Sequence, residues 1–203
     1  MRGDWAIFVI AGIAVGIFVY GNIFWCLIAY RRRTGREAAD FSKNTPLELL
    51  YVALPFLIVL GLFALTFIVE MPIDRVSASP QNRVAIGSFR WSWRFAYAGT
   101  HIVTTGTPAA PPTLYLPVRR VTEIDLTSDD VNHSFWVPAF LFKRDAIPGM
   151  TNVFDVTPRR LGTFLGRCAQ FCGLDHALMT FRVKVVPDAA YERYLASDGA
   201  LVP

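Results

Sequence analysis

Two long apolar runs dominate the first third of the chain. One covers residues 5–30 and is interrupted mainly by Asn22, and the other covers residues 47–69. A helix needs about 20 apolar residues to cross a bilayer, whereas a cleavable signal peptide has an apolar core of roughly 7–15 residues. The pattern therefore predicts a transmembrane helical hairpin within residues 1–70. Thr45, just before the second run, is expected to cap the second helix.

The segment between the two runs is basic. It carries two acidic residues, Glu37 and Asp40, against five basic ones: Arg31, Arg32, Arg33, Arg36 and Lys43. Short loops rich in Lys and Arg stay in the cytoplasm. Both termini, and all of the chain that follows the second helix, are therefore expected on the extracytoplasmic side of the membrane.

The pattern changes after the second run. Residues 71–81 form a polar linker that contains proline, and the runs that follow alternate apolar and polar side chains, as at 123–126 and 181–185. Such alternation, broken by Gly, Pro and Asp turns, is typical of antiparallel strands. We therefore expect an all-β sandwich or barrel over residues 82–187, followed by a tail, 188–203, with a short helix.

One predicted strand is unusually aromatic. In Phe89-Arg90-Trp91-Ser92-Trp93-Arg94-Phe95, aromatic side chains alternate with polar ones. A single strand would place all four rings on one face. Packing into the core is the ordinary fate of such rings, yet four on one face exceed what a small core usually needs.

Composition agrees with a membrane part joined to a globular part. Of the 203 residues, 53% are hydrophobic, which is more than an ordinary soluble domain carries. From residue 71 onward there are 14 basic and 11 acidic residues, a net charge of +3. No aromatic and basic binding face accompanies this charge, so nucleic acid is not an expected partner. Three cysteines are too few for a disulfide scaffold, and Cys26 is expected to pack or to face lipid.

The most specific chemistry lies in one short stretch. Cys168, Cys172, His176 and Met179 are soft or borderline ligands of the kind that suits copper, and His133 offers a second imidazole. A single-copper electron-transfer site needs one cysteine, so the second thiol favours two coppers bridged by both sulfurs. Two alternatives remain. A structural zinc site usually shows C-x2-C pairs, and a disulfide would leave the histidine and methionine unexplained.

These residues carry a resemblance to a known family. His133-Ser134-Phe135-Trp136, the Cys-x3-Cys-Gly-x2-His-x2-Met run and Trp91-Ser92-Trp93 resemble cytochrome c oxidase subunit II, and the resemblance covers most of the chain. It implies a cupredoxin-like Greek-key barrel that holds CuA, the binuclear copper centre of a haem–copper oxidase. The implied ligands are His133, Cys168, the backbone carbonyl of Gln170, Cys172, His176 and Met179.

The same resemblance implies an electron-entry subunit in a bacterial plasma membrane. Electrons from cytochrome c would enter at Trp91 and pass through the copper centre to haem in subunit I, where oxygen is reduced and protons are translocated. Glu48 matches a family carboxylate at the mouth of a proton channel, although an anion near a helix N-terminus is also favourable without such a role. The implied partners are subunit I, other oxidase subunits, cytochrome c and membrane lipid.

Two features depart from the family pattern. Gln170 stands where the family usually has Glu, whose carboxylate also reaches a magnesium ion at the boundary with subunit I, and an amide is a poorer ligand for that hard cation. The outer domain is basic, whereas many family members bind a basic cytochrome c on an acidic face. An acidic or membrane-tethered donor is therefore expected. Asp125, Asp129 and Asp130 are either a local acidic patch or a turn with solvated carboxylates.

The remaining candidates have plainer interpretations. Asp145 either orients a neighbour of the copper site or caps the Pro-Gly turn that follows it, and His101 is expected to be a surface histidine. A quinol oxidase subunit would lack the copper ligands, and a nitrous oxide reductase needs a histidine-rich second copper domain that three histidines cannot build. A membrane-anchored copper carrier remains as the alternative function, and it would need neither Trp91 nor Glu48.

Overall fold

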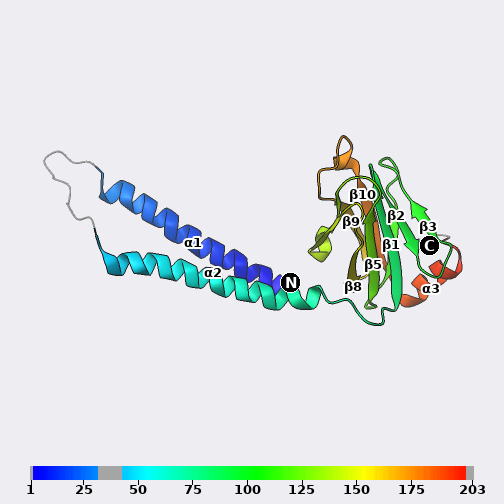
Figure 1. Ribbon diagram of the computed structural model, residues 1–203, viewed down its shortest axis with the longest axis horizontal. Coiled ribbons are helices and arrows are strands. Elements are labelled where there is room, and N and C mark those ends of the chain that lie inside the picture. The colour runs from blue at the N-terminus through cyan, green and yellow to red at the C-terminus, as the bar shows by residue number, and fades with distance from the viewer. Residues whose placement is uncertain (1, 32–42, 200–203) are drawn as a thin grey trace. The chain divides into compact units, whose positions relative to one another are not determined.

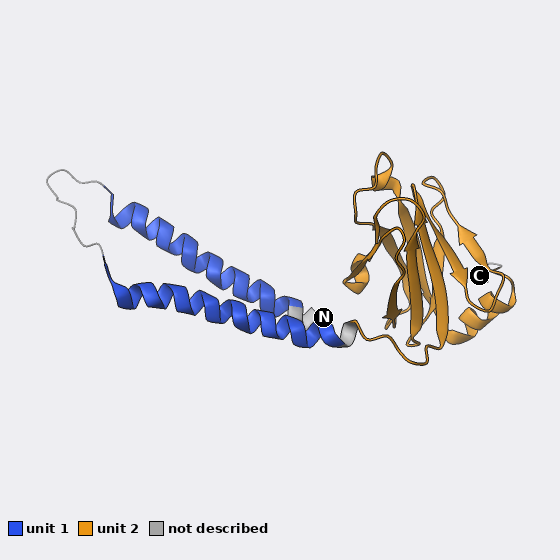
Figure 2. Cartoon of the chain, viewed as in Figure 1, with its two compact units in different colours: residues 1–72 blue, residues 73–203 orange. Residues whose placement is uncertain are grey.

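The structure, a computed structural model, describes residues 2–31 and 43–199. It divides into two compact units, Met1–Pro72 and Ile73–Pro203 (Figure 2). The division falls where the apolar runs give way to alternating side chains. The first unit is helical and the second is built mainly of strands (Figure 1).

The first unit consists of two helices, α1 (Arg2–Ala29) and α2 (Thr45–Ile73). Each is long and apolar enough to cross a membrane, as the two predicted spans require. Most of their apolar side chains are exposed, and so is Cys26 on α1. Such surfaces suit contact with lipid or with other membrane helices. The predicted cytoplasmic loop lies mostly outside the described residues, including Arg32, Arg33, Arg36, Glu37 and Asp40.

Helix α2 begins with a reciprocal cap. The backbone N–H of Leu47 donates to Oδ1 of Asn44 (3.4 Å), and the backbone N–H of Asn44 donates to the carboxylate of Glu48 (3.3 Å). The N-cap is therefore Asn44, and the prediction of Thr45 is wrong because Thr45 is already the first helical residue. The Glu48 carboxylate stabilises this helix end.

The second unit is a β-sandwich whose described residues form two five-stranded sheets (Figure 1). One sheet has the order β3-β2-β1-β5-β8, formed by Val103–Thr105, Ser92–Tyr97, Asn82–Phe89, Thr122–Ser128 and Asn152–Val156. The other has the order β4-β10-β9-β6-β7, formed by Thr113–Pro117, Thr180–Val186, Gly162–Cys168, His133–Val137 and Phe142–Ala146. Two short turns and a helix complete the unit: η1 (Pro138–Phe140), η2 (His176–Leu178) and α3 (Asp188–Ala196). The predicted helical hairpin followed by an all-β domain is thus confirmed.

Two strand pairs are parallel, β1 with β5 and β4 with β10. The expectation of a purely antiparallel sandwich is therefore wrong at these pairs. Side chains alternate with period two in both kinds of ladder, so the alternation carries no information about strand direction.

The aromatic stretch 89–95 is not one strand. β1 ends at its first residue, Arg90 and Trp91 form a turn, and β2 begins directly after the turn. Trp93 and Phe95 are fully buried in the core, whereas Trp91 is only half-buried. The prediction of four rings on one face is wrong because the chain reverses between the first two rings and the last two.

The core between the sheets is rich in aromatic rings. The ring of Phe181 meets those of Trp93, Phe95 and Phe135, with centroid distances of 5.1, 5.8 and 4.7 Å. These side chains come from both sheets and are at most 2% exposed. Close-packed rings of this kind hold the strands of the two sheets in fixed positions.

Helix α3 packs against the sandwich at the end where β10 finishes. Tyr191 and Tyr194 are buried, and the Tyr194 ring stacks on Tyr115 (4.3 Å) and meets Tyr97 edge-on (5.4 Å). The short helix predicted in the tail is therefore present. Its two tyrosines pack into the core of the sandwich.

The segment that follows α2 is fastened to the sandwich at two points. The Arg144 guanidinium on β7 pairs with Asp74 (2.6 Å), and the backbone N–H of Ser77 donates to the Asp155 carboxylate on β8 (2.7 Å). The predicted linker is therefore held along one edge of the second unit.

Candidate metal centre

Three neighbouring strands of the second sheet bring the predicted ligands to one end of the sandwich. β6 begins with His133, β9 ends with Cys168, and β10 begins directly after Met179. The loop between β9 and β10 carries Cys172 and His176, and its short helical turn is the orange segment at the top of the sandwich in Figure 1. The backbone N–H of Cys168 donates to the Met179 carbonyl (2.9 Å), which closes the loop at its base.

The two sulfurs lie at the centre of the cluster. Sγ of Cys168 is 3.9 Å from Sγ of Cys172. Nδ1 of His133 lies 3.8 Å from the Cys168 sulfur, and Nδ1 of His176 lies 3.5 Å from the Cys172 sulfur. Donor atoms of His133 and both cysteines all fall within 4.8 Å of one another, as a metal site requires.

Two weaker donors stand beside the thiols. Sδ of Met179 lies 3.7 Å from Sγ of Cys172, and the backbone carbonyl oxygen of Gln170 lies 3.2 Å from Sγ of Cys168. His133 and Met179 are fully buried, and both cysteines are nearly so. A buried cluster of soft donors fits a soft metal ion better than a strongly hydrated hard one.

The two thiols do not ionise alike. Burial, together with the Cys168 thiolate, raises the pKa of Cys172 to about 12. Burial also acts to raise the pKa of Cys168, but hydrogen bonds with His133 and with the backbone at Gln170 and Ser134 lower it to about 7. Two thiolates this close repel each other, and a metal cation beside them would remove the repulsion that raises the pKa of Cys172.

His133 is held on its far side by Asp130. Nε2 of the imidazole lies 2.9 Å from Oδ1 of Asp130, which leaves Nδ1 facing the Cys168 sulfur. Burial acts to raise the pKa of Asp130, but hydrogen bonds with His133, Arg90 and Val131 lower it to about 2. Burial acts to lower the pKa of His133, and its contacts with Cys168 and Asp130 raise it overall.

Known proteins are similar to this chain in sequence and in fold. The family model described as "Cytochrome C oxidase subunit II, periplasmic domain" matches residues 109–186. A probable cytochrome c oxidase subunit 2 of Streptomyces avermitilis is 38% identical, and the match covers 96% of this chain and 72% of the relative. The cytochrome c oxidase subunit 2 of Mycobacterium tuberculosis is 32% identical over 96% of this chain and 70% of the relative. The chain belongs to the cytochrome c oxidase subunit II family.

A solved structure agrees with membership of the subunit II family. The crystal structure of the periplasmic domain of cytochrome oxidase subunit II from Bradyrhizobium japonicum is 26% identical, with a TM-score of 0.55. It covers 61% of this chain, and the match includes 96% of the solved domain. With two helices able to span a membrane and a domain of this kind, the chain is a membrane-anchored subunit of a haem–copper oxidase complex.

In this subunit II, Trp91 lies against the ligand loop. Its indole Nε1–H donates to the carbonyl oxygen of Cys172 (3.1 Å). Gly173 has φ +115°, and a Cβ atom at this position would lie 3.3 Å from the Trp91 ring. The predicted electron-entry residue is therefore in direct contact with the backbone of a predicted copper ligand.

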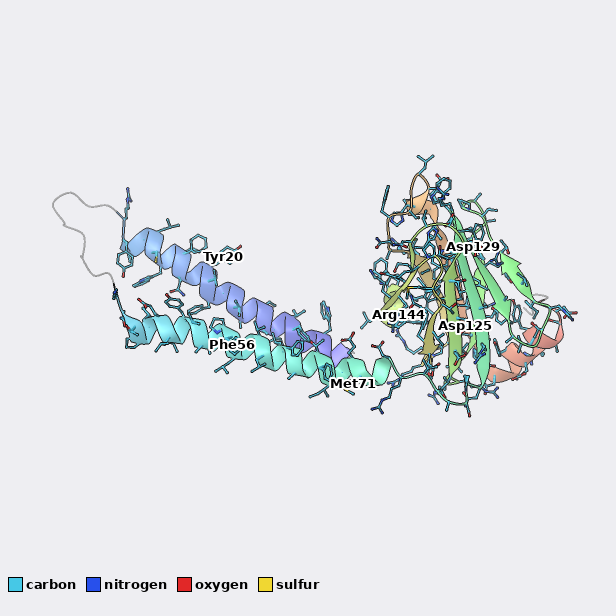
Figure 3. The ribbon with its side chains drawn as sticks, viewed as in Figure 1. Tyr20, Phe56, Met71, Asp125, Asp129 and Arg144 are labelled. Carbon is cyan, nitrogen blue, oxygen red and sulfur yellow. The ribbon has the colours of Figure 1, made fainter. Side chains whose placement is uncertain are left out.

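The three aspartates considered as an acidic patch do not form one. Asp129 pairs with Arg94 (2.9 Å) and Asp130 pairs with Arg90 (3.1 Å). Asp125 lies further back along β5, well below Asp129 in Figure 3. Asp129 and Asp130 are therefore each balanced by an arginine.

Apolar side chains stand out on the surface of the ligand loop. Phe171, Leu174 and Leu178 are 80%, 88% and 55% exposed. Exposed apolar side chains grouped in this way mark a surface for contact with another protein. We call these three side chains the apolar collar.

Two candidates remain, Asp145 and His101. On β7, Asp145 pairs across the sheet with Ser134, the residue after His133. The Asp145 carboxylate is 3.6 Å from the Lys143 ammonium, and the backbone carbonyl of Asp145 accepts a hydrogen bond from the side chain of Asn152. It is Asp130 that contacts His133, and the three-residue spacing between these two was the available sequence signal. His101 is exposed, as expected.

Proposed function

We propose that this subunit II accepts electrons from cytochrome c at a binuclear copper centre and passes them to haem in subunit I. Oxygen reduction and proton translocation would take place in subunit I. The observation that best supports this proposal is the pair of thiols 3.9 Å apart, each with an imidazole and a weaker donor beside it. When bound, a copper pair held by these donors would supply a one-electron carrier.

The ligands are preorganised by the fold. They would be His133, Cys168, the backbone carbonyl of Gln170, Cys172, His176 and Met179. Because the strand ends and the closed loop already bring these donors together, little rearrangement is needed to hold the metal pair. Burial of the two thiols keeps water from competing with them.

Trp91 would receive the electron from the donor. Its ring is half-buried, so one part remains open to a docking protein while the indole N–H is bonded to the Cys172 carbonyl. This hydrogen bond and the covalent bonds of Cys172 form a short path from the ring to the sulfur. The apolar collar on the same loop would bind the donor, since apolar contacts of this kind dominate the centre of protein interfaces.

The donor would be an acidic or membrane-tethered cytochrome c. Residues 71–203 carry a net charge of +3, and Asp129 and Asp130 near the ligand end are paired with arginines. A soluble basic donor would therefore gain little from electrostatic steering there.

Glu48 would load protons into a channel of subunit I from the cytoplasmic side. We expect Glu48→Gln to lower oxygen consumption of the assembled oxidase at least about tenfold, because positioned proton-transfer groups contribute roughly 10²–10⁴-fold. The glutamine oxygen still accepts the Asn44 N–H, so the helix cap is kept while the charge is lost. The matched control is Glu70→Gln, which removes the other acid of α2. Equal oxygen consumption in the two variants would contradict this role.

Gln170 would weaken the magnesium contact without weakening the copper site. Its backbone carbonyl faces Cys168, whereas its exposed side chain is a neutral amide. A hard cation at the boundary with subunit I would lose one carboxylate ligand here.

The copper centre can be tested on the full chain purified in detergent and loaded with copper. We expect two coppers per chain and a paramagnetic resonance spectrum in which one unpaired electron is shared equally by two copper nuclei. The reason is that the two sulfurs lie 3.9 Å apart and each has one imidazole beside it. Cys172→Ser should abolish the shared spectrum.

One localised copper per chain, or none, would overturn the binuclear centre. Such a result would support the alternative of a membrane-anchored copper carrier. The control is Cys26→Ser, because this cysteine is exposed on α1 and belongs to the other unit.

A further inference from the structure

We propose that Asp130 is a positioning residue that ties the copper ligand His133 to the turn carrying Trp91, a role that rests on the function proposed above. The two oxygens of this one carboxylate serve two different partners. One holds the imidazole, and the other holds the residue before the electron-entry tryptophan.

The first oxygen fixes the imidazole. Oδ1 of Asp130 lies 2.9 Å from Nε2 of His133 and also accepts the backbone N–H of Val131 (2.6 Å). An ionised carboxylate only accepts hydrogen bonds, so the imidazole hydrogen is held on Nε2. Nδ1 is then left with its lone pair, facing the Cys168 sulfur at 3.8 Å. Asp130 thereby selects the tautomer that can bind metal through Nδ1.

The second oxygen fixes the turn between β1 and β2. Oδ2 of Asp130 accepts the backbone N–H of Arg90 (2.8 Å) and the Nε–H of the same residue (3.1 Å). Trp91 follows directly and is bonded at its other side to the Cys172 carbonyl. The tryptophan is thus positioned from both sides, by Asp130 through Arg90 and by the ligand loop.

The carboxylate itself is held in place by its surroundings. The Ser128 hydroxyl donates to the Val131 carbonyl, and the backbone N–H of Asp129 donates to the Ser88 carbonyl of β1 (2.9 Å). The short turn that carries Asp130 is therefore bound both internally and to the neighbouring strand. Its side chain is 22% exposed, so water screens the charge only in part.

Asp129 offers a matched control from the same turn. It carries the same charge, but its partner is Arg94 and its side chain is 44% exposed. Asp129→Ala therefore removes one negative charge near the site without touching His133 or Arg90. Arg94→Ala is the matching control for Arg90→Ala.

The test compares Asp130→Ala, Asp130→Asn and Asp129→Ala in the full, copper-loaded chain. For Asp130→Ala we expect copper affinity to fall about 10–100-fold, the usual effect of removing a partner of a ligating histidine. The nitrogen hyperfine couplings of one of the two histidines should change, and the reduction potential should rise because a negative charge beside the oxidised site is lost. Asp130→Asn, whose amide oxygen still accepts Nε2–H, should restore the hyperfine couplings but not the potential.

The contact between Asp130 and Arg90 is tested by measuring the rate at which electrons enter the copper-loaded chain. Arg90→Ala should slow reduction by cytochrome c relative to reduction by a small uncharged reductant, while the histidine hyperfine couplings stay as in the wild type. Arg94→Ala should change neither quantity. Circular dichroism of each variant checks that the sandwich is folded. If Asp130→Ala does not fold, Asp130→Asn is compared with Asp129→Ala in its place.

The outcomes separate this role from the function on which it rests. A wild-type chain without a two-copper spectrum would overturn the proposed function, and the role of Asp130 with it. A normal wild-type spectrum, with Asp130→Ala and Asp130→Asn both indistinguishable from Asp129→Ala in hyperfine couplings and potential, would overturn the role of Asp130 alone.

Discussion

At the scale of single residues, Gly166 shows how tightly the ligand strand is packed. It lies on β9 two residues before Cys168, and a Cβ atom there would sit 2.1 Å from the ring of Phe181. That ring is fully buried among three other aromatic side chains and has no free space to move into. Only glycine fits at this position.

Gly166→Ala should therefore lower the free energy of unfolding by about 1–3 kcal/mol, the usual cost of overpacking a core. Gly87→Ala is the matched control, because a Cβ there would meet only the flexible end of the Arg94 side chain. Urea unfolding followed by near-ultraviolet circular dichroism measures both. Equal stability of the two variants would show that the Phe181 ring can move aside.

The spacing of the soft donors was enough to predict the cluster, because a closed loop brings residues three or four apart into contact. Asp130 was not predicted as the partner of His133. Its contact depends on how the turn 128–131 folds, which the three-residue spacing to His133 does not determine. Trp91 was predicted to be the electron-entry residue, but its place in a turn was not predicted, because alternation of side chains cannot show a two-residue turn.

At the scale of elements, the contact between β2, β4 and α3 is a cluster of buried tyrosines. The Tyr97 hydroxyl oxygen accepts the backbone N–H of Tyr115 (2.7 Å) in a region where both residues are buried. The ring of Tyr97 also meets Tyr191 and Tyr194 of α3. This hydroxyl therefore satisfies a backbone donor that water cannot reach.

Tyr97→Phe should lower the free energy of unfolding by about 1–3 kcal/mol, because it leaves the Tyr115 N–H without a partner in a buried place. Tyr115→Phe, which removes a hydroxyl outside this hydrogen bond, is the control. Thermal unfolding of the two variants gives the comparison, and a smaller loss for Tyr97→Phe than for Tyr115→Phe would contradict the assignment.

The unfolding free energy of Tyr97→Phe should also depend less on pH under alkaline conditions. Burial raises the pKa of Tyr97 well above the value of 10.0 that it has when exposed. The contribution of Tyr97 to stability is therefore fully present below pH 10 and is lost as the pH rises above it, because this tyrosine ionises first in the unfolded chain. The slope of unfolding free energy against pH above 10 should be smaller in Tyr97→Phe than in the wild type.

Strands such as β10 could be predicted because their apolar and polar side chains alternate. Their partners could not be. The parallel pairs β1 with β5 and β4 with β10 depend on long connections, and a period of two is the same for either direction. Helix α3 was predicted from its own sequence, but its place in the core depends on Tyr97 and Tyr115 from distant strands.

At the scale of the whole molecule, charge is distributed unevenly between the domain and its ligand end. Residues 71–203 are basic overall, yet Asp129 and Asp130 are paired with arginines and the loop beside Trp91 exposes apolar side chains. Long-range attraction and close contact therefore favour a partner that is acidic overall but apolar where it touches the loop.

An acidic cytochrome c should reduce the copper-loaded chain about tenfold faster at low salt than a basic one of similar potential, the lower end of electrostatic steering. The difference should shrink as salt is raised, because the Debye length falls to about 8 Å at physiological ionic strength. Stopped-flow reduction across a salt series measures this, with a small uncharged reductant as the control. A faster reaction with the basic donor at low salt would contradict the expectation.

The division into a helical hairpin and a β domain followed from the sequence alone, because two apolar runs long enough to span a membrane precede the alternating runs of the strands. The pairing of charges at the ligand end could not be predicted from the sequence. Counting residues gives a total of +3, but only folding shows that Arg90 and Arg94 neutralise two of the carboxylates.

The hydrogen bond between Cys168 and Met179 has a thermodynamic consequence for metal uptake. Because it closes the ligand loop as part of the β9–β10 hairpin, the conformational entropy of the loop is given up when the domain folds and not when metal arrives. Metal binding and folding are then largely uncoupled, unlike in small zinc domains that are unfolded without their ion. Copper uptake should accordingly show almost no change in heat capacity, and its affinity would include no cost of folding the loop.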